Sequence, residues 1–314
     1  MRPDPPEVRA AGAHHDIELD FGLVVTGHGR HYTVETPEGV RVLCHPRGKK
    51  SDCVVGDRVR WRATNEHADE GVIEHIEPRR NLMFRQDEWR TKSFAANIDR
   101  LLMLVAAQPV FSENQLARAL IAAESAGIPS LIALNKTDLT GPAEAARARL
   151  VPYLAMGYQV VELALKTQPE ASRDKLMQHL GTGSSLVLGP SGSGKSTLVN
   201  LLVPGALAPV GELSVALNSG RHTTTTTRWY WLDGARQAAL LDSPGFQEFG
   251  LRQVQADALA GCMPDLRPYQ GQCRFYNCTH VHEPGCAVLA AVEQGTVSAS
   301  RHRIYVGLRE EMGR

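Results

Sequence analysis

Residues Gly189 to Ser196 read GPSGSGKS, which fits the phosphate-loop pattern G-x-x-x-x-G-K-[ST] at every fixed position. The apolar run 186–188 precedes this loop, and a helix-like segment, 197–202, follows it. When a strand, a glycine-rich loop and a helix follow one another in this way, backbone N–H groups converge on phosphate oxygens at the N-terminus of the helix. A flexible Gly/Ser linker is the alternative, but the fixed spacing and the Lys-Ser pair disfavour it. The stretch therefore predicts a site for a nucleoside triphosphate.

A second motif, N-K-x-D, indicates the base. Residues Asn135 to Asp138 follow the apolar run 131–134, which puts them at the carboxyl end of a predicted strand, where open α/β sheets bind ligands. The Asp138 carboxylate can accept two hydrogen bonds from the N1–H and N2–H₂ edge of guanine, a pair of donors that adenine lacks. Taken alone, the four residues also fit a turn with Asp138 as a helix N-cap. Beside the phosphate loop, they favour guanine.

A third motif, D-x-P-G, spans Asp242 to Gly245 after the apolar pair 240–241. Asp242 is expected to hold Mg²⁺ through a water, and the Gly245 N–H to sense the γ-phosphate. A strand that ends in a Pro-Gly turn is the alternative. A transporter-type ATPase would carry Glu at Ser243, and the sequence has no L-S-G-G-Q signature, so that class is disfavoured.

A run of threonines, 223–227, lies between the phosphate loop and Asp242. One threonine near the start of the run could ligate Mg²⁺, and the end of the run could lead into a β-strand at 229–232. The spacing does not choose among Thr223, Thr224 and Thr225.

Cysteine and histidine gather near the C-terminus in the spacing C-x₄-C-x-H-x₅-C. Three thiolates and one imidazole are enough for a closed, tetrahedral, structural zinc site. His282 is a rival for the histidine ligand. The segment from 251 onward is too short for a large core, so zinc is expected to supply folding energy of about 10 kcal/mol. The predicted zinc ligands are Cys273, Cys278, His280 and Cys286.

Between residues 20 and 78, short apolar runs alternate with polar residues and are separated by glycine turns. Five short strands of this kind suit a small OB-type barrel, a common nucleic-acid platform. A basic stretch within it could bind RNA phosphates and stack a base on its tryptophan, or it could be a solvated basic face. The predicted RNA-binding residues are Arg47, Lys49, Lys50, Arg58, Arg60, Trp61 and Arg62.

The global composition sets further bounds. Lys+Arg and Asp+Glu both total 34, so any RNA contact must come from local patches. A length of 314 residues predicts two or three domains. No apolar stretch is long enough to span a membrane, and residues 1–20 lack the apolar core of a signal peptide. We therefore expect a cytoplasmic protein with reduced thiols and a disordered tail over residues 1–18.

The order of the motifs is unusual, because N-K-T-D precedes the phosphate loop instead of following it. This order, the zinc-type cluster and the flanking segments resemble the circularly permuted GTPases of the RsgA type, which act in small-ribosomal-subunit biogenesis. The resemblance covers roughly residues 22–309. It implies a multidomain α/β chain with a disordered tail (1–18), an OB-type RNA-binding β-barrel (19–80), a linker (81–97), a circularly permuted P-loop GTPase domain (98–250) and a mostly helical zinc-binding module (251–314).

The resemblance also implies an activity and partners. The chain is expected to hydrolyse GTP faster on the small ribosomal subunit, to assist late maturation of that subunit, and to contact its rRNA as a monomer. One structural zinc ion and Mg²⁺ with GTP are the implied cofactors. A GTP-dependent switch acting on a non-ribosomal partner remains an alternative. A nucleotide kinase is a third possibility, which the base motif and the cysteine cluster disfavour.

The resemblance further implies site residues. Phe246 stands where many GTPases place a water-orienting Gln, so His222 is the expected catalytic residue, with Lys195 on the phosphates. Ala164 to Lys166 stand where such GTPases have Ser-Ala-Lys; a bracing serine is missing, although the Leu165 N–H could still reach the base. The expected nucleotide-binding residues are Asn135, Lys136, Thr137, Asp138, Ala164, Leu165, Lys166, Gly189, Pro190, Ser191, Gly192, Ser193, Gly194, Lys195, Ser196, Thr197, Asp242 and Gly245. The expected Mg²⁺ ligands are Ser196, Thr223, Thr224, Thr225 and Asp242.

Overall fold

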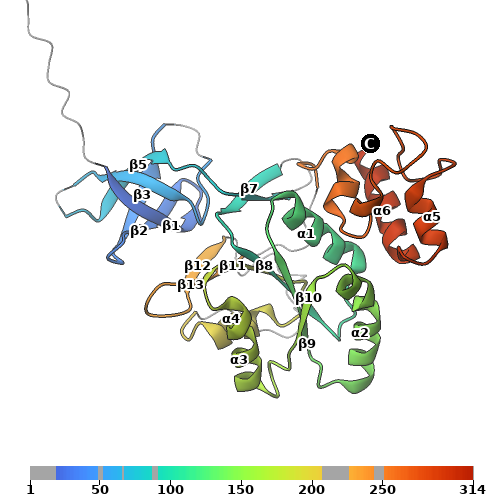
Figure 1. Ribbon diagram of the computed structural model, residues 1–314. Coiled ribbons are helices and arrows are strands. Elements are labelled where there is room, and N and C mark those ends of the chain that lie inside the picture. The colour runs from blue at the N-terminus through green and yellow to red at the C-terminus, as the bar shows by residue number, and fades with distance from the viewer. Residues whose placement is uncertain are drawn as a thin grey trace, which may run out of the picture.

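The computed structural model describes residues 19–48, 52–65, 67–86, 91–206, 226–243 and 251–313. Three parts follow one another along the chain: a β-barrel, a central α/β domain and a helical C-terminal module. Figure 1 shows the barrel and the C-terminal module on opposite sides of the central domain. The tail predicted over residues 1–18 lies outside the described residues.

The barrel is a closed sheet of five strands. Its strand order is β1-β2-β3-β5-β4, and β4 pairs again with β1. Side chains alternate between the interior and the surface, as in β4, where Val59 and Trp61 are buried between exposed arginines. The barrel predicted from the alternating pattern is therefore confirmed. Its strands are β1 (Asp20–His28), β2 (His31–Glu35), β3 (Arg41–Pro46), β4 (Arg58–Ala63) and β5 (Glu70–Ile76).

The segment predicted as a linker, 81–97, contains an antiparallel strand pair, β6 (Leu82–Gln86) and β7 (Thr91–Ala96). Met83 is 1% exposed and Phe94 is 6% exposed, so both side chains belong to the core rather than to a solvated connection. The pair is also tied to the barrel, because the Ala96 N–H donates to the Val55 carbonyl at 3.0 Å.

The central domain is built on a sheet of order β10-β9-β8-β11-β13-β12, in which only β12 is antiparallel to its neighbour. Its first strand in the chain, β8, lies between β9 and β11, which carry the two nucleotide motifs at their ends. The elements are β8 (Arg100–Ala106), α1 (Glu113–Ser125), β9 (Ser130–Asn135), α2 (Thr140–Ala155), β10 (Gln159–Glu162), α3 (Pro169–Leu180), β11 (Gly183–Leu188), α4 (Lys195–Leu202), β12 (Arg228–Trp231) and β13 (Ala238–Asp242).

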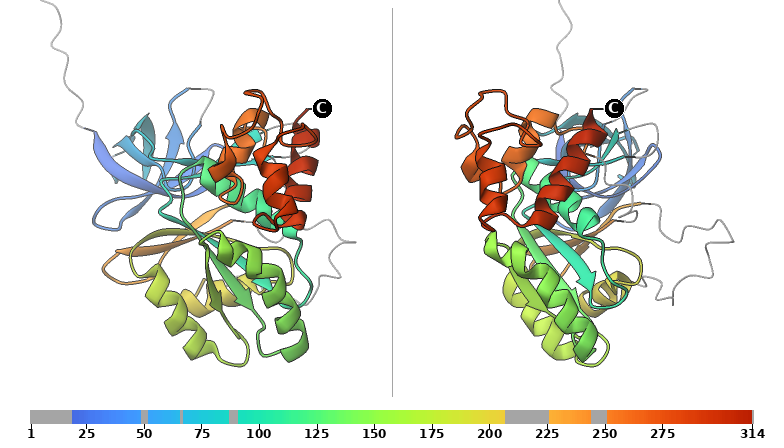
Figure 2. Two further views of the ribbon diagram at one scale, coloured as in Figure 1. Left: turned by 45° about the vertical axis from the view of Figure 1, so that its right-hand side comes forward. Right: turned by 90° about the vertical axis from the view of Figure 1, so that its right-hand side faces the viewer.

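Helices cover both faces of this sheet. Alternate β8 residues divide between two apolar clusters: Met103 packs with α1 and α2, whereas Leu102 and Leu104 pack with α3 and α4. Such continuous apolar strands are typical of parallel sheets buried on both sides. Figures 1 and 2 show the helices arranged around the sheet.

The C-terminal module consists of η3 (Ala256–Cys262), η4 (Arg267–Tyr269), α5 (Ala287–Glu293) and α6 (Ala299–Met312). Its apolar side chains share one cluster with α1 and α2, so the module packs on that face of the central domain. A buried ion pair joins Arg301 to Asp265 at 2.9 Å, and the Arg301 guanidinium lies 5.2 Å from the ring centroid of Tyr153 in α2. The module is thereby attached to the helix that follows the N-K-T-D motif.

The barrel meets the central domain through strands. Thr26 of β1 pairs with Arg228 of β12, which joins barrel and central sheet into one sheet of 11 strands. Next to this pairing, the Trp231 Nε1–H donates to Glu35 at 2.6 Å.

One buried carboxylate organises the barrel edge and generates a prediction. Asp57 is fully buried, accepts a hydrogen bond from the Val54 N–H at 2.8 Å, and contacts both Arg79 Nε and a terminal Arg79 nitrogen at 2.7 and 2.8 Å. In Asp57→Ala these donors lose their acceptor, so we expect the free energy of unfolding of the barrel to fall by about 3 kcal/mol. Hydrogen exchange of the barrel amides measures this loss.

The surface pair Arg60–Glu77 is the matched control, with a contact of 2.7 Å and side chains 45% and 28% exposed. Because water screens this pair, Glu77→Ala should cost less than about 1 kcal/mol. Equal losses in the two variants would contradict the assigned role of Asp57.

Candidate functional site

The predicted nucleotide motifs meet at one edge of the central sheet. Strands β9, β11 and β13 are parallel within one sheet, and they end at Asn135, Leu188 and Asp242. Because the carboxyl ends of parallel strands face the same edge, the base motif, the phosphate loop and the D-x-P-G aspartate come together there. The changed chain order does not alter this arrangement.

Asn135 joins three of the segments directly. Its side chain is 3% exposed, and its Nδ2 donates to the Ser193 carbonyl in the phosphate loop at 2.9 Å. Its Oδ1 accepts the Leu165 N–H at 3.1 Å. The base motif, the phosphate loop and the loop after β10 are therefore held by one buried amide.

Two glycines allow the phosphate loop this close approach. Gly194 has a φ of +100°, and a Cβ at that position would lie 2.3 Å from Asn135 Nδ2. A Cβ at Gly189 would lie 2.7 Å from the Leu104 carbonyl oxygen. Helix α4 begins at Lys195, directly after the loop, so its first N–H groups and its dipole favour an anion there.

Lys195 and Asp242 are in contact across the site. The Lys195 Nζ lies 2.5 Å from Asp242 Oδ1, and the two side chains are 21% and 8% exposed. Thr227 and Ser243 lie beside them, buried, with hydroxyl oxygens 3.1 Å apart. Lys195 and Asp242, which the sequence assigns to phosphate and to Mg²⁺, are therefore in direct contact.

The base motif has a constrained backbone. Lys136 has a φ of +63°, and its Nζ donates to the Gln108 carbonyl at 2.6 Å. Burial lowers the pKa of Lys136, with a further lowering from Lys166 that Asp138 opposes. Asp138 itself is exposed.

The loop after β8 also belongs to the site, although the sequence analysis did not include it. A Cβ at Gly192 would lie 3.1 Å from Pro109 Cδ, which places Pro109 against the phosphate loop. Together with the Lys136 contact to Gln108, this loop touches both motifs. The only sequence signal is a Gln-Pro pair directly after an apolar strand.

The loop of Ala164 to Lys166 differs from the sequence expectation. A bracing serine was expected to be missing, but Ser172 in α3 supplies a hydroxyl that accepts the Ala164 N–H at 3.1 Å. Ser172 is 2% exposed, so the brace is buried. The Leu165 N–H, which the sequence analysis left able to reach the base, donates to Asn135 Oδ1 at 3.1 Å in this structure.

Several predicted site residues lie outside the described residues, namely His222, Thr223, Thr224, Thr225, Gly245, Lys49 and Lys50. The other predicted nucleotide-binding residues lie in the phosphate loop, at the start of α4, in the base motif, in the loop after β10 or at the end of β13.

The four predicted metal ligands form a compact cluster in the C-terminal module. Their ligand atoms all lie within 4.8 Å of one another. The Cys273 and Cys286 sulfurs are 3.9 Å apart, and His280 Nδ1 lies 3.4 and 3.5 Å from them. Thiolates bound to one tetrahedral zinc ion at about 2.3 Å lie about 3.8 Å apart, so the cluster fits a metal ion of this kind.

Surrounding groups position these ligands. The Ala287 N–H donates to the Cys273 sulfur at 3.3 Å, and the His280 carbonyl lies 2.8 Å from His302 Nε2. The rival ligand His282 is exposed and outside the cluster. His280 is thus the histidine of the site.

The predicted RNA-binding stretch is less basic than its sequence indicates. Arg47 and Arg62 both contact Glu74, at 2.8 and 2.7 Å, and Arg60 contacts Glu77. Glu74 lies on β5 and Glu77 directly after it. A count of charges within the basic stretch itself therefore does not include them. Arg58 has no acidic partner among the described residues.

The prediction that Trp61 stacks a base is wrong. Its side chain is 3% exposed and fills the barrel core, and a Cβ at Gly71 would lie 2.6 Å from its ring. The alternation of β4 places Trp61 inside while Arg58 and Arg60 face outward. The ring therefore serves the barrel and is not available to RNA.

Among the described residues, no helix combines the length and apolar composition that crossing a bilayer requires.

Known proteins share both the sequence and the fold. The RsgA GTPase family matches residues 76–252. A protein of Variovorax paradoxus named "Small ribosomal subunit biogenesis GTPase RsgA" is 58% identical over 315 aligned residues, which cover 99% of this chain and 98% of the relative. A protein of the same name from Paraburkholderia xenovorans is 52% identical and covers 92% of both chains.

Two solved structures are similar over almost their whole length. YjeQ from Thermotoga maritima has a TM-score of 0.73 at 30% identity, with 95% of this chain and 100% of YjeQ covered. YloQ, described as a circularly permuted GTPase, has a TM-score of 0.69 at 26% identity, with 96% and 98% covered. Together with the joined base and phosphate motifs, these matches show that the chain belongs to the RsgA GTPase family and is a GTP-hydrolysing enzyme.

Proposed function

We propose that this GTPase acts on the small ribosomal subunit, which stimulates its GTP hydrolysis during late maturation. Relatives that match nearly the whole chain are named for this process. The observation that carries the GTP part of the proposal is the contact of Asn135 with Ser193, because it holds the N-K-x-D motif against the phosphate loop. We infer that the enzyme works in the cytoplasm, as a monomer, and contacts rRNA.

The nucleotide is assigned as GTP with Mg²⁺. Asp138 reads the guanine edge, and the Lys136 stem covers the ring. Lys195 compensates the β- and γ-phosphate charge. Ser196 and Asp242 would hold the Mg²⁺ ion with one of the threonines at 223–225. The Lys195–Asp242 contact of 2.5 Å supports this assignment, since phosphate and metal must share the space around both groups.

The attacking water needs an orienting group, and Phe246 cannot hydrogen-bond to it. We assign this role to His222, which precedes the threonine run. Binding of the ribosomal subunit would bring His222 to the attacking water and so complete the site.

The metal in the C-terminal module is assigned as one structural zinc ion. Its four ligands are Cys273, Cys278, His280 and Cys286, so all four tetrahedral positions are filled by protein. Such an ion contributes folding energy and leaves no open position for chemistry.

RNA binding is assigned to the outer face of the barrel. Arg47, Arg58, Arg60 and Arg62 lie on β3, β4 or directly beside them, and Lys49 and Lys50 follow Arg47 in the sequence. Exchange of the carboxylate partners of Arg47, Arg60 and Arg62 for RNA phosphates would make binding dependent on salt.

The central prediction concerns turnover. Purified small ribosomal subunits should raise GTP hydrolysis but not ATP hydrolysis, because adenine lacks the donors that Asp138 accepts. His222→Ala should abolish this stimulation while GTP binding persists. Phosphate release with and without subunits measures both effects.

Unchanged turnover of the wild-type enzyme on subunits would favour a switch for a non-ribosomal partner. Stimulation that survives in His222→Ala would remove this residue from the mechanism.

A second prediction tests the brace of the base loop. Ser172→Ala leaves the buried Ala164 N–H without its acceptor, so GDP should bind about tenfold more weakly. Ser130→Ala is the control, because the Ser130 hydroxyl has no hydrogen-bond partner among the described residues. Calorimetric titration with GDP measures the change, and equal affinities in the two variants would contradict the brace.

A third prediction concerns metal removal. Cys286→Ser, or a chelator applied to the wild-type protein, should unfold the C-terminal module and leave GDP binding by the central domain in place. Circular dichroism and zinc content measure the first effect, and GDP titration the second. A module that keeps its hydrogen-exchange protection after zinc loss would contradict the structural role.

A further inference from the structure

A pocket of about 460 Å³ lies between the barrel and the central domain. Asp99, at the start of β8, and Gly183, the first residue of β11, line it, so it lies at the amino end of the sheet, opposite the GTP site. Barrel strands β1, β2 and β4 supply the other wall. Its volume is in the range of small-molecule sites, which commonly form between domains.

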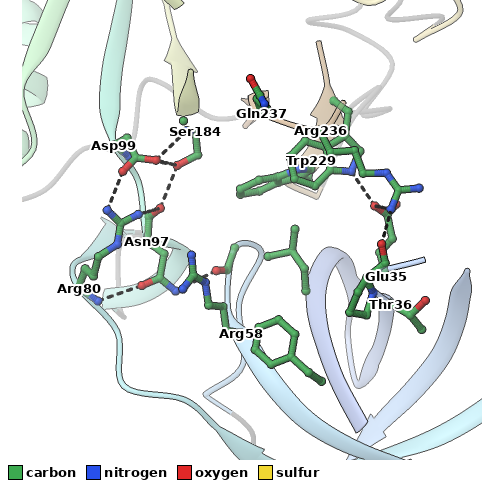
Figure 3. A pocket seen from close by; sticks show the side chains of 16 residues that line it. Glu35, Thr36, Arg58, Arg80, Asn97, Asp99, Ser184, Trp229, Arg236 and Gln237 are labelled. Carbon is green, nitrogen blue, oxygen red and sulfur yellow. Dashed lines mark hydrogen bonds and ion pairs between the residues drawn. The ribbon is translucent and has the colours of Figure 1, made fainter. Parts of the chain in front are cut away.

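The carboxylates that line the pocket are already compensated. Asp99 lies 2.6 Å from Arg80 and accepts the Ser184 N–H at 2.8 Å. Glu35 accepts the Trp231 Nε1–H at 2.6 Å and the Arg41 Nε–H at 3.0 Å. Figure 3 shows these two polar groupings on opposite sides of the pocket. Neither leaves a net negative charge for a cation.

Two donors in the lining have no partner. The Arg58 guanidinium has no hydrogen bond or ion pair among the described residues, although it is exposed beside the pocket. The Trp229 Nε1–H is buried and has no acceptor among them, and the residue is 8% exposed. That nitrogen is closed to solvent, so of these two the accessible unpaired donor that a ligand in the pocket can reach is the Arg58 guanidinium.

Aromatic surfaces are available next to these donors. Trp229 is fixed by an edge-on contact with Trp231, with ring centroids 5.3 Å apart. Phe21 lines the same pocket and is 38% exposed, with the Arg60 guanidinium over its ring. Flat rings held rigidly beside an arginine are the groups that bind a nucleobase and its phosphate.

We propose that this pocket binds a nucleotide, with the base against Phe21 and Trp229 and the phosphate on Arg58. A purely apolar ligand would leave the Arg58 cation unpaired, and a cationic ligand would be repelled by it. The same chemistry is presented by a free mononucleotide and by one nucleotide of a single-stranded RNA.

The test uses the full-length zinc-loaded protein saturated with GDP and Mg²⁺, so that the GTP site is filled. The probes are adenosine 5′-monophosphate and single-stranded hexaadenylate, because adenine does not suit Asp138. Adenosine 5′-monophosphate should bind with a stoichiometry of one. Arg58→Gln should weaken its binding about tenfold through loss of a charge-assisted contact, and Trp229→Phe about fivefold through loss of stacking area.

The matched control is Arg303→Gln, which removes an exposed arginine on α6, away from the pocket. Arg58 is a surface residue, so its variant should fold, and unchanged GDP affinity verifies this for all variants. Tighter binding of the monophosphate assigns the pocket to a free nucleotide. Tighter binding of hexaadenylate that Trp229→Phe weakens assigns it to RNA, because Trp229 lies outside the RNA-binding face proposed for the barrel. Probe affinities that are equal in Arg58→Gln, Trp229→Phe and Arg303→Gln, or no binding of either probe to the wild type, would overturn the proposal.

Discussion

The nucleotide site depends on the buried amide of Asn135. It donates to the Ser193 carbonyl and accepts the Leu165 N–H, so three segments distant in the chain are fixed at one sheet edge. The Gly194 backbone leaves room for it, since a Cβ there would overlap the amide nitrogen. A buried amide that satisfies donor and acceptor in this way also orients the backbone on either side of it. The meeting of the base motif and the phosphate loop therefore depends on this one side chain.

The permuted order has a consequence for the C-terminal module. In the permuted order, the strand that ends at Asp242 is the last strand of the central domain, so the chain leaves the domain there. The C-terminal module that follows packs on α1 and α2. Its buried Arg301–Asp265 pair contacts Tyr153 of α2, the helix that begins directly after the base motif. The described contacts of the C-terminal module are thus with the half of the central domain that carries N-K-T-D. The barrel, by contrast, is joined to β12 next to the strand of Asp242.

The sequence predicted those parts in which chemistry depends on local spacing. The phosphate loop, N-K-T-D and the Cys/His cluster each have fixed intervals, and the structure joins the first two and brings together the four ligands of the third. Residue spacing could not predict contacts whose two partners lie far apart in the sequence. The brace Ser172 sits on another helix, and Glu74 and Glu77, which neutralise the basic stretch, belong to a different part of the barrel. The prediction for Trp61 was wrong because the arginines beside it suggested an exposed face. In a β-strand, side chains alternate between the two faces, so Trp61 lies inside the barrel while its neighbours lie outside.

A crystal structure of the protein with GDP and Mg²⁺ tests most directly whether the base motif and the phosphate loop bind one nucleotide together. We expect one GDP molecule whose purine edge lies within hydrogen-bond distance of the Asp138 carboxylate and whose β-phosphate lies within the same range of Lys195 Nζ. A nucleotide that contacts only one of these two residues, or two nucleotides bound apart, would contradict the single site built around Asn135.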